Sequence, residues 1–331
     1  MNSVGILFPT TVTGFAQDRP LRKRQEKAFT GRFPDGSTES LEEEMRDYTL
    51  NAVRLQRTLG LDVPDAARSD YPDEIGTMAR TLAGFQLDLS AGGMSRHTIT
   101  NTYISKPSVS GTVKFQPDIN RLVPALSALM DAEAGKNGNN LKISIPGIYT
   151  LAARAMKTDS KNFDSLLESL LPAYNDALTT FQTPFVQFNE YELLKNATID
   201  NVERIKSIYQ RVSCPGKKIM AFYYGDIGLI AGHLDEIPVD IVHIDVFYGT
   251  NSAHLLRSAP RRKELVLGLL DSVQYRGDDE DSAIRLVKQL AERVEPENLW
   301  LSTNGDLVYR GRSFAESKIK ALVRIAGALR S

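Results

Sequence analysis

The stretch KIMAFYYGDI, residues 218–227, carries a clear signal for a buried strand. Its apolar residues, Ile219 to Phe222, include no charge, and two tyrosines follow before a Gly-Asp step. A short apolar run bounded by a turn signal is typical of a strand that is covered on both faces. We therefore interpret residues 218–224 as a strand of a parallel sheet.

Similar short apolar runs alternate along the chain with amphipathic segments. Residues 40–60, 162–181, 282–294 and 314–329 place apolar side chains mostly three and four positions apart, which predicts helices. Strands that alternate with helices indicate a parallel sheet with covered faces. We predict an α/β fold over residues 1–331, a single domain built as a single (β/α)8 TIM barrel. A barrel needs eight strands and the sequence offers nine candidates, so one of them, 110–115 or 4–8, is expected to be peripheral. The candidates are 4–8, 61–63, 110–115, 141–145, 184–188, 218–224, 239–247, 264–270 and 298–302.

Composition excludes several classes of function. The chain has 331 residues, and its 40 basic and 41 acidic side chains leave a net charge of −1, so no field of one sign favours nucleic acid or an anionic membrane. The single cysteine, Cys214, excludes an internal disulfide framework and a cysteine-based metal cluster. No apolar run is long enough for a membrane span, and the N-terminal run is too short for a signal peptide. We expect a cytoplasmic protein that acts on a small molecule and has no nucleic-acid or membrane partner; its oligomeric state is left open.

Several strand ends carry motifs in a recognisable order. These are TTVTGF (10–15), RLQRTLGLDVPDAAR (54–68), KISIPGIYTLA (142–152) and VQFNEYEL (186–193). Together they resemble the catalytic domain of cobalamin-independent methionine synthase, in the superfamily that includes uroporphyrinogen decarboxylase. The resemblance extends over about residues 10–329. It implies a barrel enzyme whose site lies at the carboxyl ends of the strands.

The resemblance also implies a zinc ion that turns a thiol into a methyl acceptor. The family holds this ion with a His-x-Cys pair, a Glu and a late Cys, and the corresponding positions here are Phe222, Tyr224, Asp245 and Asn304. Phenylalanine has no donor atom, and asparagine is a poor zinc ligand beside a thiolate. We therefore expect no zinc site of the family type and predict no other cofactor. A folate-type methyl donor remains compatible with the sequence.

The positions that resemble the family's amino-acid clamp have also changed. The two carboxylates that the family uses to hold homocysteine correspond to Ala67 and Asn189. Each lost charge-assisted hydrogen bond is worth about 1.5–3 kcal/mol. The resemblance, with these changes, points to methyl transfer to an acceptor other than homocysteine.

Polar residues nevertheless remain at the predicted mouth. His243 and Asp245 are two positions apart in VDIVHIDVF (239–247), so they project to the same face of the strand. With Tyr224 they are predicted to form a proton-transfer cluster, or a nitrogen/oxygen metal site. The alternative is that His243 only satisfies a backbone carbonyl group in the core. The predicted catalytic residues are Tyr224, His243 and Asp245, and the predicted substrate-binding residues are Thr13, Asn189, Glu190, Asp226, Asp271 and Asn304.

Three functions therefore stay open. The first is an enzyme that has exchanged thiolate chemistry for another reaction, either methyl transfer or acid–base chemistry. The second is a divergent methionine synthase with a mixed nitrogen/oxygen metal site. The third is an inactive paralogue that binds a ligand or partner. Buried carboxylates at strand ends are costly unless they are used or paired, which favours an enzyme.

Overall fold

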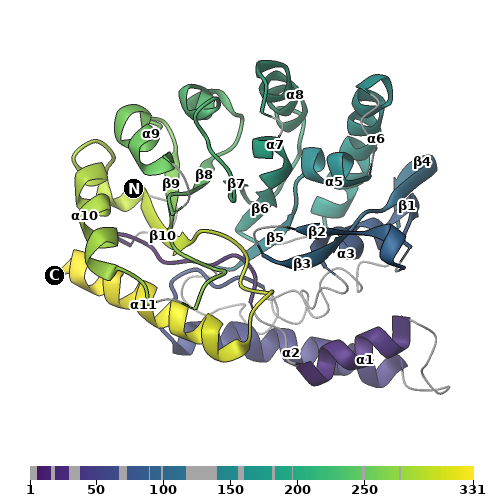
Figure 1. The fold of residues 1–331 in the computed structure, drawn as a ribbon, viewed down its shortest axis with the longest axis horizontal. Helices are drawn as coiled ribbons and strands as arrows, with labels where there is room; N and C mark the ends of the chain where they lie inside the picture. The colour runs from purple at the N-terminus through teal and green to yellow at the C-terminus, as the bar shows by residue number, and fades with distance from the viewer. Residues whose placement is uncertain are drawn as a thin grey trace.

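The computed structural model has a mixed α/β fold, with a central sheet surrounded by helices (Figure 1). It describes residues 6–15, 19–29, 38–66, 73–88, 90–97, 100–116, 140–155, 160–180, 183–195, 197–247, 250–275 and 277–331. No helix in these ranges is long and apolar enough to cross a bilayer.

A parallel sheet of six strands forms the centre of the fold, in the order β10-β9-β8-β7-β6-β5. Every neighbouring pair in this sheet is parallel. The stretch with which the sequence analysis began forms β7, which ends at Phe222, two residues before the predicted end at Tyr224. The strands are β5 (Lys142–Pro146), β6 (Phe185–Asn189), β7 (Lys217–Phe222), β8 (Ile241–Asp245), β9 (Glu264–Leu270) and β10 (Leu299–Thr303).

Two short segments connect the outer strands of this sheet through isolated parallel bridges. Thr10 pairs with Leu301 of β10, Thr11 pairs with Val63, and Asp65 pairs with Lys142 of β5. Backbone hydrogen bonds support these bridges, for example from Thr11 N–H to the Leu301 carbonyl oxygen at 2.9 Å. The sequence analysis predicted the first strand at residues 4–8, whereas the first bridging segment lies at residues 10–13. Residues 4 and 5 lie outside the described residues.

The sheet is strongly curved. The rings of Phe185 on β6 and Trp300 on β10 are 5.3 Å apart in an edge-to-face contact. These two strands are four positions apart in the sheet, which would separate them by about 19 Å if the sheet were flat. The inner face therefore encloses an apolar layer, made of Val63, Phe185, Ile219, Ile241, Val266 and Trp300.

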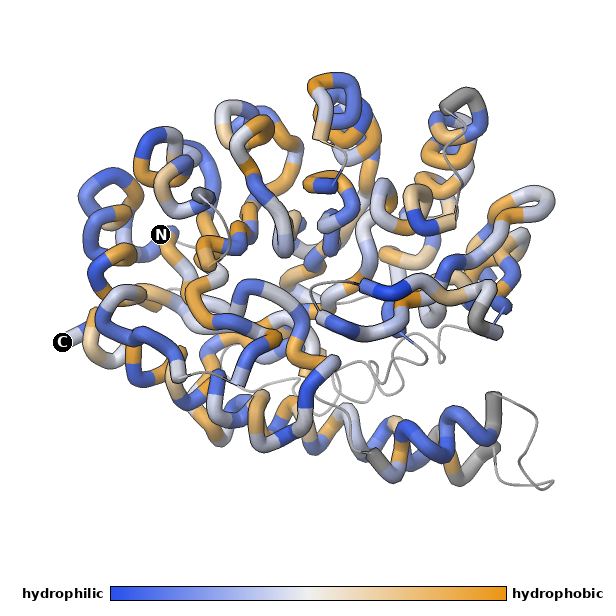
Figure 2. The backbone as a smooth tube through the Cα atoms, in the orientation of Figure 1, coloured by the Kyte–Doolittle hydropathy of each residue, from blue (hydrophilic) through white to orange (hydrophobic). Residues whose placement is uncertain are grey.

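Amphipathic helices cover the outer face, and their apolar side chains join one large core with the outward side chains of the strands. Figure 2 shows hydrophobic and hydrophilic positions alternating along α2 and α11, as the sequence periods predicted. The four predicted helices are confirmed, with ends shifted by a few residues. The helices are α1 (Arg19–Phe29), α2 (Thr38–Thr58), α3 (Glu74–Arg80), α5 (Ile148–Ala155), α6 (Ser160–Leu178), α7 (Tyr191–Lys195), α8 (Ile199–Tyr209), α9 (Asn251–Ser258), α10 (Glu280–Ala291) and α11 (Arg312–Arg330), with short 3-10 helices η1 (Ala91–Gly93), η3 (Ala231–Glu236) and η4 (Pro296–Asn298).

Two antiparallel strand pairs lie outside the main sheet. β1 (Leu82–Gln86) pairs with β4 (Ser108–Phe115), and β2 (Met94–His97) pairs with β3 (Thr102–Ser105). Segment 110–115 is part of β4, which confirms that it is the peripheral candidate. The β2–β3 hairpin lies beside the end of the sheet at which the candidate site is found (Figure 1).

The inner apolar layer predicts a large stability effect. Trp300 is fully buried and donates its indole N–H to Glu264 at 2.7 Å. Trp300→Ala should lower the free energy of unfolding in urea by about 3–5 kcal/mol, the range for large buried aromatic side chains. Tyr103→Ala, at an aromatic residue that is 64% exposed, is the control and should change it by less than about 0.5 kcal/mol. Equal effects of the two changes would contradict this account of the core.

Candidate functional site

Polar side chains from four neighbouring strand ends meet at the carboxyl end of the sheet. Asp245 accepts the backbone N–H of Tyr224 at 3.0 Å and that of Phe247 at 2.9 Å. The Asn304 amide accepts the N–H of Ser272 at 2.8 Å, and its nitrogen lies 3.5 Å from Asp245 Oδ2. The hydroxyls of Tyr224 and Ser272 are 3.0 Å apart. We call Tyr224, Asp245, Ser272 and Asn304 the strand-end cluster; three of its members were predicted from the sequence.

Tyr224 adopts an unusual backbone conformation. Its φ of +63° lies in the left-handed region, which costs a residue other than glycine about 1–3 kcal/mol. Gly305 makes room for the side chain, because a Cβ at Gly305 would lie only 2.3 Å from Tyr224 Oη. Asp245 and Gly305 together therefore fix where this ring lies.

His243 lies inside the sheet but does not pair with Asp245. Its Nε2 is 3.0 Å from the Thr303 carbonyl oxygen, and its Nδ1 has no hydrogen-bond partner among the described residues. Burial and the nearby Lys142 lower the pKa of His243 to about 3, so the ring is neutral at pH 7. The predicted His243–Asp245 pairing is wrong, since Asp245 turns toward the backbone N–H groups at the ends of β7 and β8. The geometry fits the alternative of a core histidine.

Thr13 and Asn189 lie together, linked by Gln187. The Gln187 amide donates to Thr13 Oγ1 at 2.8 Å and to Asn189 Oδ1 at 2.9 Å. Asn189 in turn donates to the buried carboxylate of Glu74 at 2.8 Å. Glu74 was missed in the sequence because Asp73 and Glu74 carry the ordinary signal of a helix start. A substrate role for Thr13 and Asn189 stays a prediction.

Glu190 binds the start of α5 and not the strand-end cluster. Its carboxylate accepts the N–H groups of Tyr149 and Thr150, at 3.1 and 2.7 Å, and the Tyr209 hydroxyl at 2.6 Å. Gly147 admits this contact, since a Cβ there would lie 2.0 Å from Glu190 Cδ. Burial raises the pKa of Glu190 to about 7. The observed contacts are those of a helix cap.

The remaining predicted residues lie in three different settings. Asp271 is buried at the end of β9 and accepts the Val273 N–H at 2.8 Å. Asp226 is 54% exposed and accepts the Thr250 hydroxyl, away from the strand-end cluster. Phe222 belongs to the core between sheet and helices. Phe222, which corresponds to a zinc-ligand position of the family, therefore faces the helices, because Ile219 faces inward and side chains alternate along β7.

An aromatic group that sequence reasoning missed borders the strand-end cluster. The ring centroid of His97 is 5.5 Å from that of Tyr224 and 6.0 Å from that of Tyr191. Tyr191 stacks on Tyr223 at 5.4 Å, and Tyr223 contacts Tyr224 at 4.7 Å. These rings come from the β2–β3 hairpin and from the ends of β6 and β7, so only the fold brings them together.

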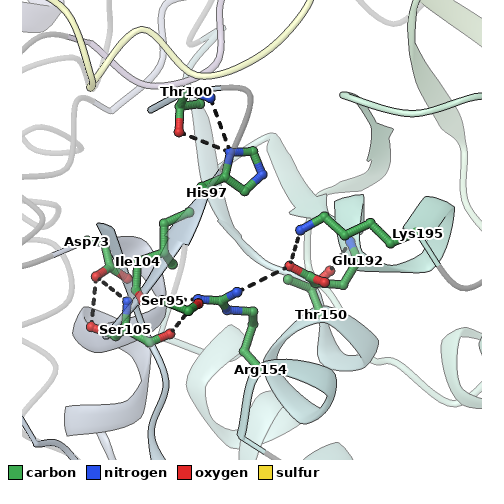
Figure 3. Close-up of polar contacts among 10 residues, drawn as sticks. All are labelled: Asp73, Ser95, His97, Thr100, Ile104, Ser105, Thr150, Arg154, Glu192 and Lys195. Atoms are coloured by element: carbon green, nitrogen blue, oxygen red, sulfur yellow. Dashed lines mark hydrogen bonds and ion pairs between the residues drawn. The ribbon is translucent and has the colours of Figure 1, made fainter. Parts of the chain in front are cut away.

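A polar network fixes the β2–β3 hairpin at this position (Figure 3). Arg154 of α5 donates to Ser95 Oγ at 2.6 Å and to the carbonyl oxygens of Ile104 and Ser105 at 3.0 and 3.1 Å. Asp73 accepts the backbone N–H and the hydroxyl of Ser105 at 2.8 and 2.7 Å. The hairpin is therefore anchored from two helices, and His97 is held beside the strand-end cluster.

A separate pocket of about 790 Å³ lies between β4, α6 and η1, with Lys106, Val109, Ser165 and Ser169 in its lining. None of its lining residues belongs to the strand-end cluster. We place the candidate chemistry at the strand ends, because there carboxylate, amide and hydroxyl side chains from four strand ends contact one another, whereas the polar residues of the pocket come from β4, α6 and the loops beside them.

The fold and site define a protein with a parallel α/β sheet and a polar cluster at the strand ends. Residues 67–295 match the family model described as "Cobalamin-independent synthase, N-terminal domain". The chain belongs to this family. The motif resemblance had pointed to the catalytic domain; the family is confirmed, and the matching model is that of the N-terminal domain.

Similar proteins cover almost the whole chain. The methionine synthases of Saccharolobus solfataricus and Sulfolobus acidocaldarius are 24% and 23% identical to it, each over 96% of this chain and over 93% and 91% of their own lengths. The B12-independent methionine synthase of Shewanella sp. W3-18-1, solved with selenomethionine, is 16% identical, with a TM-score of 0.77 and 98% of both chains covered. A putative vitamin-B12 independent methionine synthase from Listeria monocytogenes gives a TM-score of 0.72 over 99% of both chains, at 16% identity.

Gly305 gives a direct test of how Tyr224 is held. In Gly305→Ala the added methyl group would overlap the Tyr224 ring, so the ring must move or the core must expand. The free energy of unfolding should fall by about 1–3 kcal/mol, as for other overpacked sites. Gly232→Ala is the control, because no atom lies within 4 Å of the position that an added Cβ would take there. A Gly305→Ala protein as stable as the control would show that the ring is not confined.

Glu190 predicts a particular pH dependence of stability. Its folded-state pKa of about 7 is above the unfolded value of 4.5, so the folded state retains the proton over this interval. Stability should therefore fall as pH rises from about 4.5 to 7, by about 3 kcal/mol in total. Urea unfolding at pH 5 and 7.5 should show this fall in the parent protein and lose most of it in Glu190→Gln. Exposed Glu168→Gln is the control, and the same pH dependence in all three proteins would contradict the assignment.

Proposed function

We propose that this chain is a methyl-transferring member of its family that acts on a small-molecule acceptor other than homocysteine, without a thiolate–zinc centre. The supporting observation is the make-up of the strand-end cluster. Tyr224, Asp245, Ser272 and Asn304 offer only oxygen and amide nitrogen at the point where the family resemblance implies thiolate ligands.

The donor atoms here do not fit a thiolate-bound zinc ion. Both carboxylate oxygens of Asp245 accept backbone N–H groups, which orients them toward the chain. The single cysteine, Cys214, precedes β7 and so belongs to the end of the strand opposite Tyr224; burial also raises the pKa of its thiol. Among the described residues, no three or more His, Cys, Asp and Glu side chains are grouped so that they could hold a metal ion.

The proposed chemistry uses the Tyr224 and Ser272 hydroxyls. As the acceptor forms a bond to the methyl carbon, the bond from that carbon to the nitrogen of the folate-type donor breaks. The acceptor loses a proton and the donor nitrogen gains one, and the hydroxyl pair could relay a proton from the first to the second. Asp245 acts through the backbone of Tyr224 and keeps the ring in place. The methyl donor would be of the folate type that the family resemblance implies, with Thr13, Asn189 and Asp271 as substrate contacts.

We also infer that the sheet closes as a single (β/α)8 barrel in one domain over residues 1–331. The parallel bridges from β10 through residues 10–11 and 63–65 to β5 support this inference. Closure would bring Thr13 to the end of the sheet at which the strand-end cluster lies. Thr13 forms an isolated parallel bridge with Asp306, which follows β10.

A second candidate is a genuine methionine synthase with a mixed nitrogen/oxygen metal site. The observation in its favour is that relatives named methionine synthase align over nearly their full lengths. The two candidates differ in the acceptor that they require.

An acceptor assay separates them. The purified protein is given methyltetrahydrofolate carrying a labelled methyl group, with homocysteine and with or without added zinc. We expect no methionine formation near ordinary enzyme rates, because a thiol with a pKa near 8.5 has no activating group here. Turnover of about 1 per second or more would contradict the proposal and favour the second candidate.

The proposed role of Tyr224 is tested with a panel of other nucleophilic acceptors. Label transfer to the best acceptor should fall about 10²–10⁴-fold in Tyr224→Phe, as for a lost proton-transfer group. Tyr103→Phe, at an exposed tyrosine, should leave the rate unchanged. A Tyr224→Phe protein with more than about a third of the parent rate would exclude the hydroxyl from the reaction.

A further inference from the structure

The strand-end cluster is closed to solvent. Tyr224 is 7% exposed and Ser272 is 1% exposed, and Asp245 and Asn304 are fully buried. A small molecule cannot contact the hydroxyls of Tyr224 and Ser272 while these groups stay covered. A neighbouring segment must therefore move before a substrate reaches them, as lids and loops do in many enzymes.

The β2–β3 hairpin covers the cluster without belonging to the main sheet. His97, the last residue of β2, is buried, and its ring centroid lies 5.5 Å from that of Tyr224. Within the described residues, the two strands of the hairpin pair only with each other. A two-stranded hairpin is marginally stable by itself in water, so its position depends on contacts with the rest of the protein.

One guanidinium nitrogen of Arg154 holds both strands of the hairpin (Figure 3). It donates to Ser95 Oγ on β2 at 2.6 Å. It also donates to the carbonyl oxygens of Ile104 and Ser105 on β3, at 3.0 and 3.1 Å. Asp73 accepts the N–H and the hydroxyl of Ser105, a contact with β3 alone. Of these two anchors, Arg154 is therefore the one that binds both strands.

The two ends of the hairpin have the features of a hinge. Gly93 precedes β2 and Lys106 follows β3, and the Lys106 N–H donates to the Gly93 carbonyl oxygen at 2.9 Å. Both residues line the pocket of about 790 Å³ between β4, α6 and η1. Open space therefore lies beside the point about which the hairpin would turn.

We propose that the β2–β3 hairpin is a gate over the strand-end cluster, and that Arg154 is the positioning residue that holds this gate shut. The gate opens when the hairpin turns about its two ends and takes His97 away from Tyr224, and it closes again over the bound substrate. Closure excludes bulk water from the site during the reaction. The proposal rests on the proposed function only in taking the strand-end cluster as the place where the substrate binds.

The pKa of His97 reports whether the gate is shut. Burial, followed by the cations Lys195 and Arg154, lowers this pKa from 6.5 to about 4. In Arg154→Met the hairpin should leave the cluster, so an NMR titration of the imidazole should show the pKa of His97 rising most of the way back to 6.5. His233 on η3 is an internal reference, and its titration should not change.

Lys195→Met is the matched control, because it also removes a cation near His97. Lys195 Nζ lies 2.7 Å from Glu192 Oε1, and the Arg154 guanidinium lies 3.6 Å from the same oxygen. The other described contact of Lys195 is with the Tyr191 ring, so it does not hold the hairpin. Lys195 lowers the pKa of His97 more than Arg154 does. If only the lost charge mattered, Lys195→Met would raise this pKa at least as much as Arg154→Met, whereas the gate requires the larger rise in Arg154→Met.

Access to the cluster is measured directly with a thiol at position 272. Ser272→Cys in a Cys214→Ser background carries a single thiol, and its reaction with an uncharged maleimide is followed over time. Adding Arg154→Met should speed this labelling about 10–100-fold, the factor expected when a hydrogen bond from a charged group no longer holds a segment closed. Adding Lys195→Met should leave the labelling rate unchanged.

The native thiol shows whether the rest of the fold stays closed. Cys214 should label at the same rate in the parent protein and in Arg154→Met. If Cys214 labels faster in Arg154→Met, Arg154→Lys takes its place in both measurements, with the same expected results. Arg154→Lys keeps the positive charge and loses the fork of guanidinium donors, so a rise in the pKa of His97 in that protein reports release of the hairpin alone.

Either of two results would overturn the proposal. One is a rise in the pKa of His97 in Arg154→Met that is no larger than in Lys195→Met, since the hairpin then stays in place without Arg154. The other is unchanged labelling of Ser272→Cys in a protein whose hairpin has been released, since the hairpin then does not cover the cluster. Both measurements are made without methyl transfer, so their outcome and that of the acceptor assay are independent.

Discussion

The hydrogen bond from the Tyr224 N–H to Asp245 determines the geometry of the candidate site. It joins the end of β7 to the end of β8 and holds Tyr224 in the left-handed region. A hydrogen bond to a buried carboxylate is worth about 1.5–3 kcal/mol, and the left-handed conformation costs about 1–3 kcal/mol. The two nearly cancel, so the conformation also depends on packing over Gly305 and against the neighbouring rings. Loss of any of these contacts should release the ring.

Much of the fold could be predicted from local patterns. The apolar run of β7 was enough to predict a strand, and the apolar periodicity of α2, α6, α10 and α11 was enough to predict helices. Each pattern indicates which side chains of its own segment are buried. The convergence of Tyr224, Asp245 and Asn304 also followed, since parallel strands end at one edge of a sheet. The side on which Phe222 lies did not follow from the motif, because Ile219 faces inward and side chains alternate along β7, which turns Phe222 toward the helices.

The rest depended on contacts between distant segments. His243 and Asp245 share a face of β8, but they do not bond to each other. The His243 ring bonds to the Thr303 carbonyl group, and Asp245 accepts the Tyr224 N–H. The sequence of β8 gives no sign of either partner. Glu190 follows β6 as expected, yet it caps α5. His97 comes from the β2–β3 hairpin, Tyr191 from the first residue of α7, and Glu74 from the first residue of α3. Their sequence signals are those of ordinary structure, and only the fold brings them to one place.

The central proposal is that oxygen and amide groups occupy the strand ends at which the family resemblance implies a sulfur-bound metal site. Zinc titration by calorimetry tests it most directly, using the metal-stripped protein and an Asp245→Asn variant. Protein zinc sites with thiolate and histidine ligands have binding free energies of about 10–16 kcal/mol. The account predicts no stoichiometric binding with a Kd below about 1 μM, and no difference between the two proteins. Stoichiometric binding of higher affinity that is lost in Asp245→Asn would contradict it.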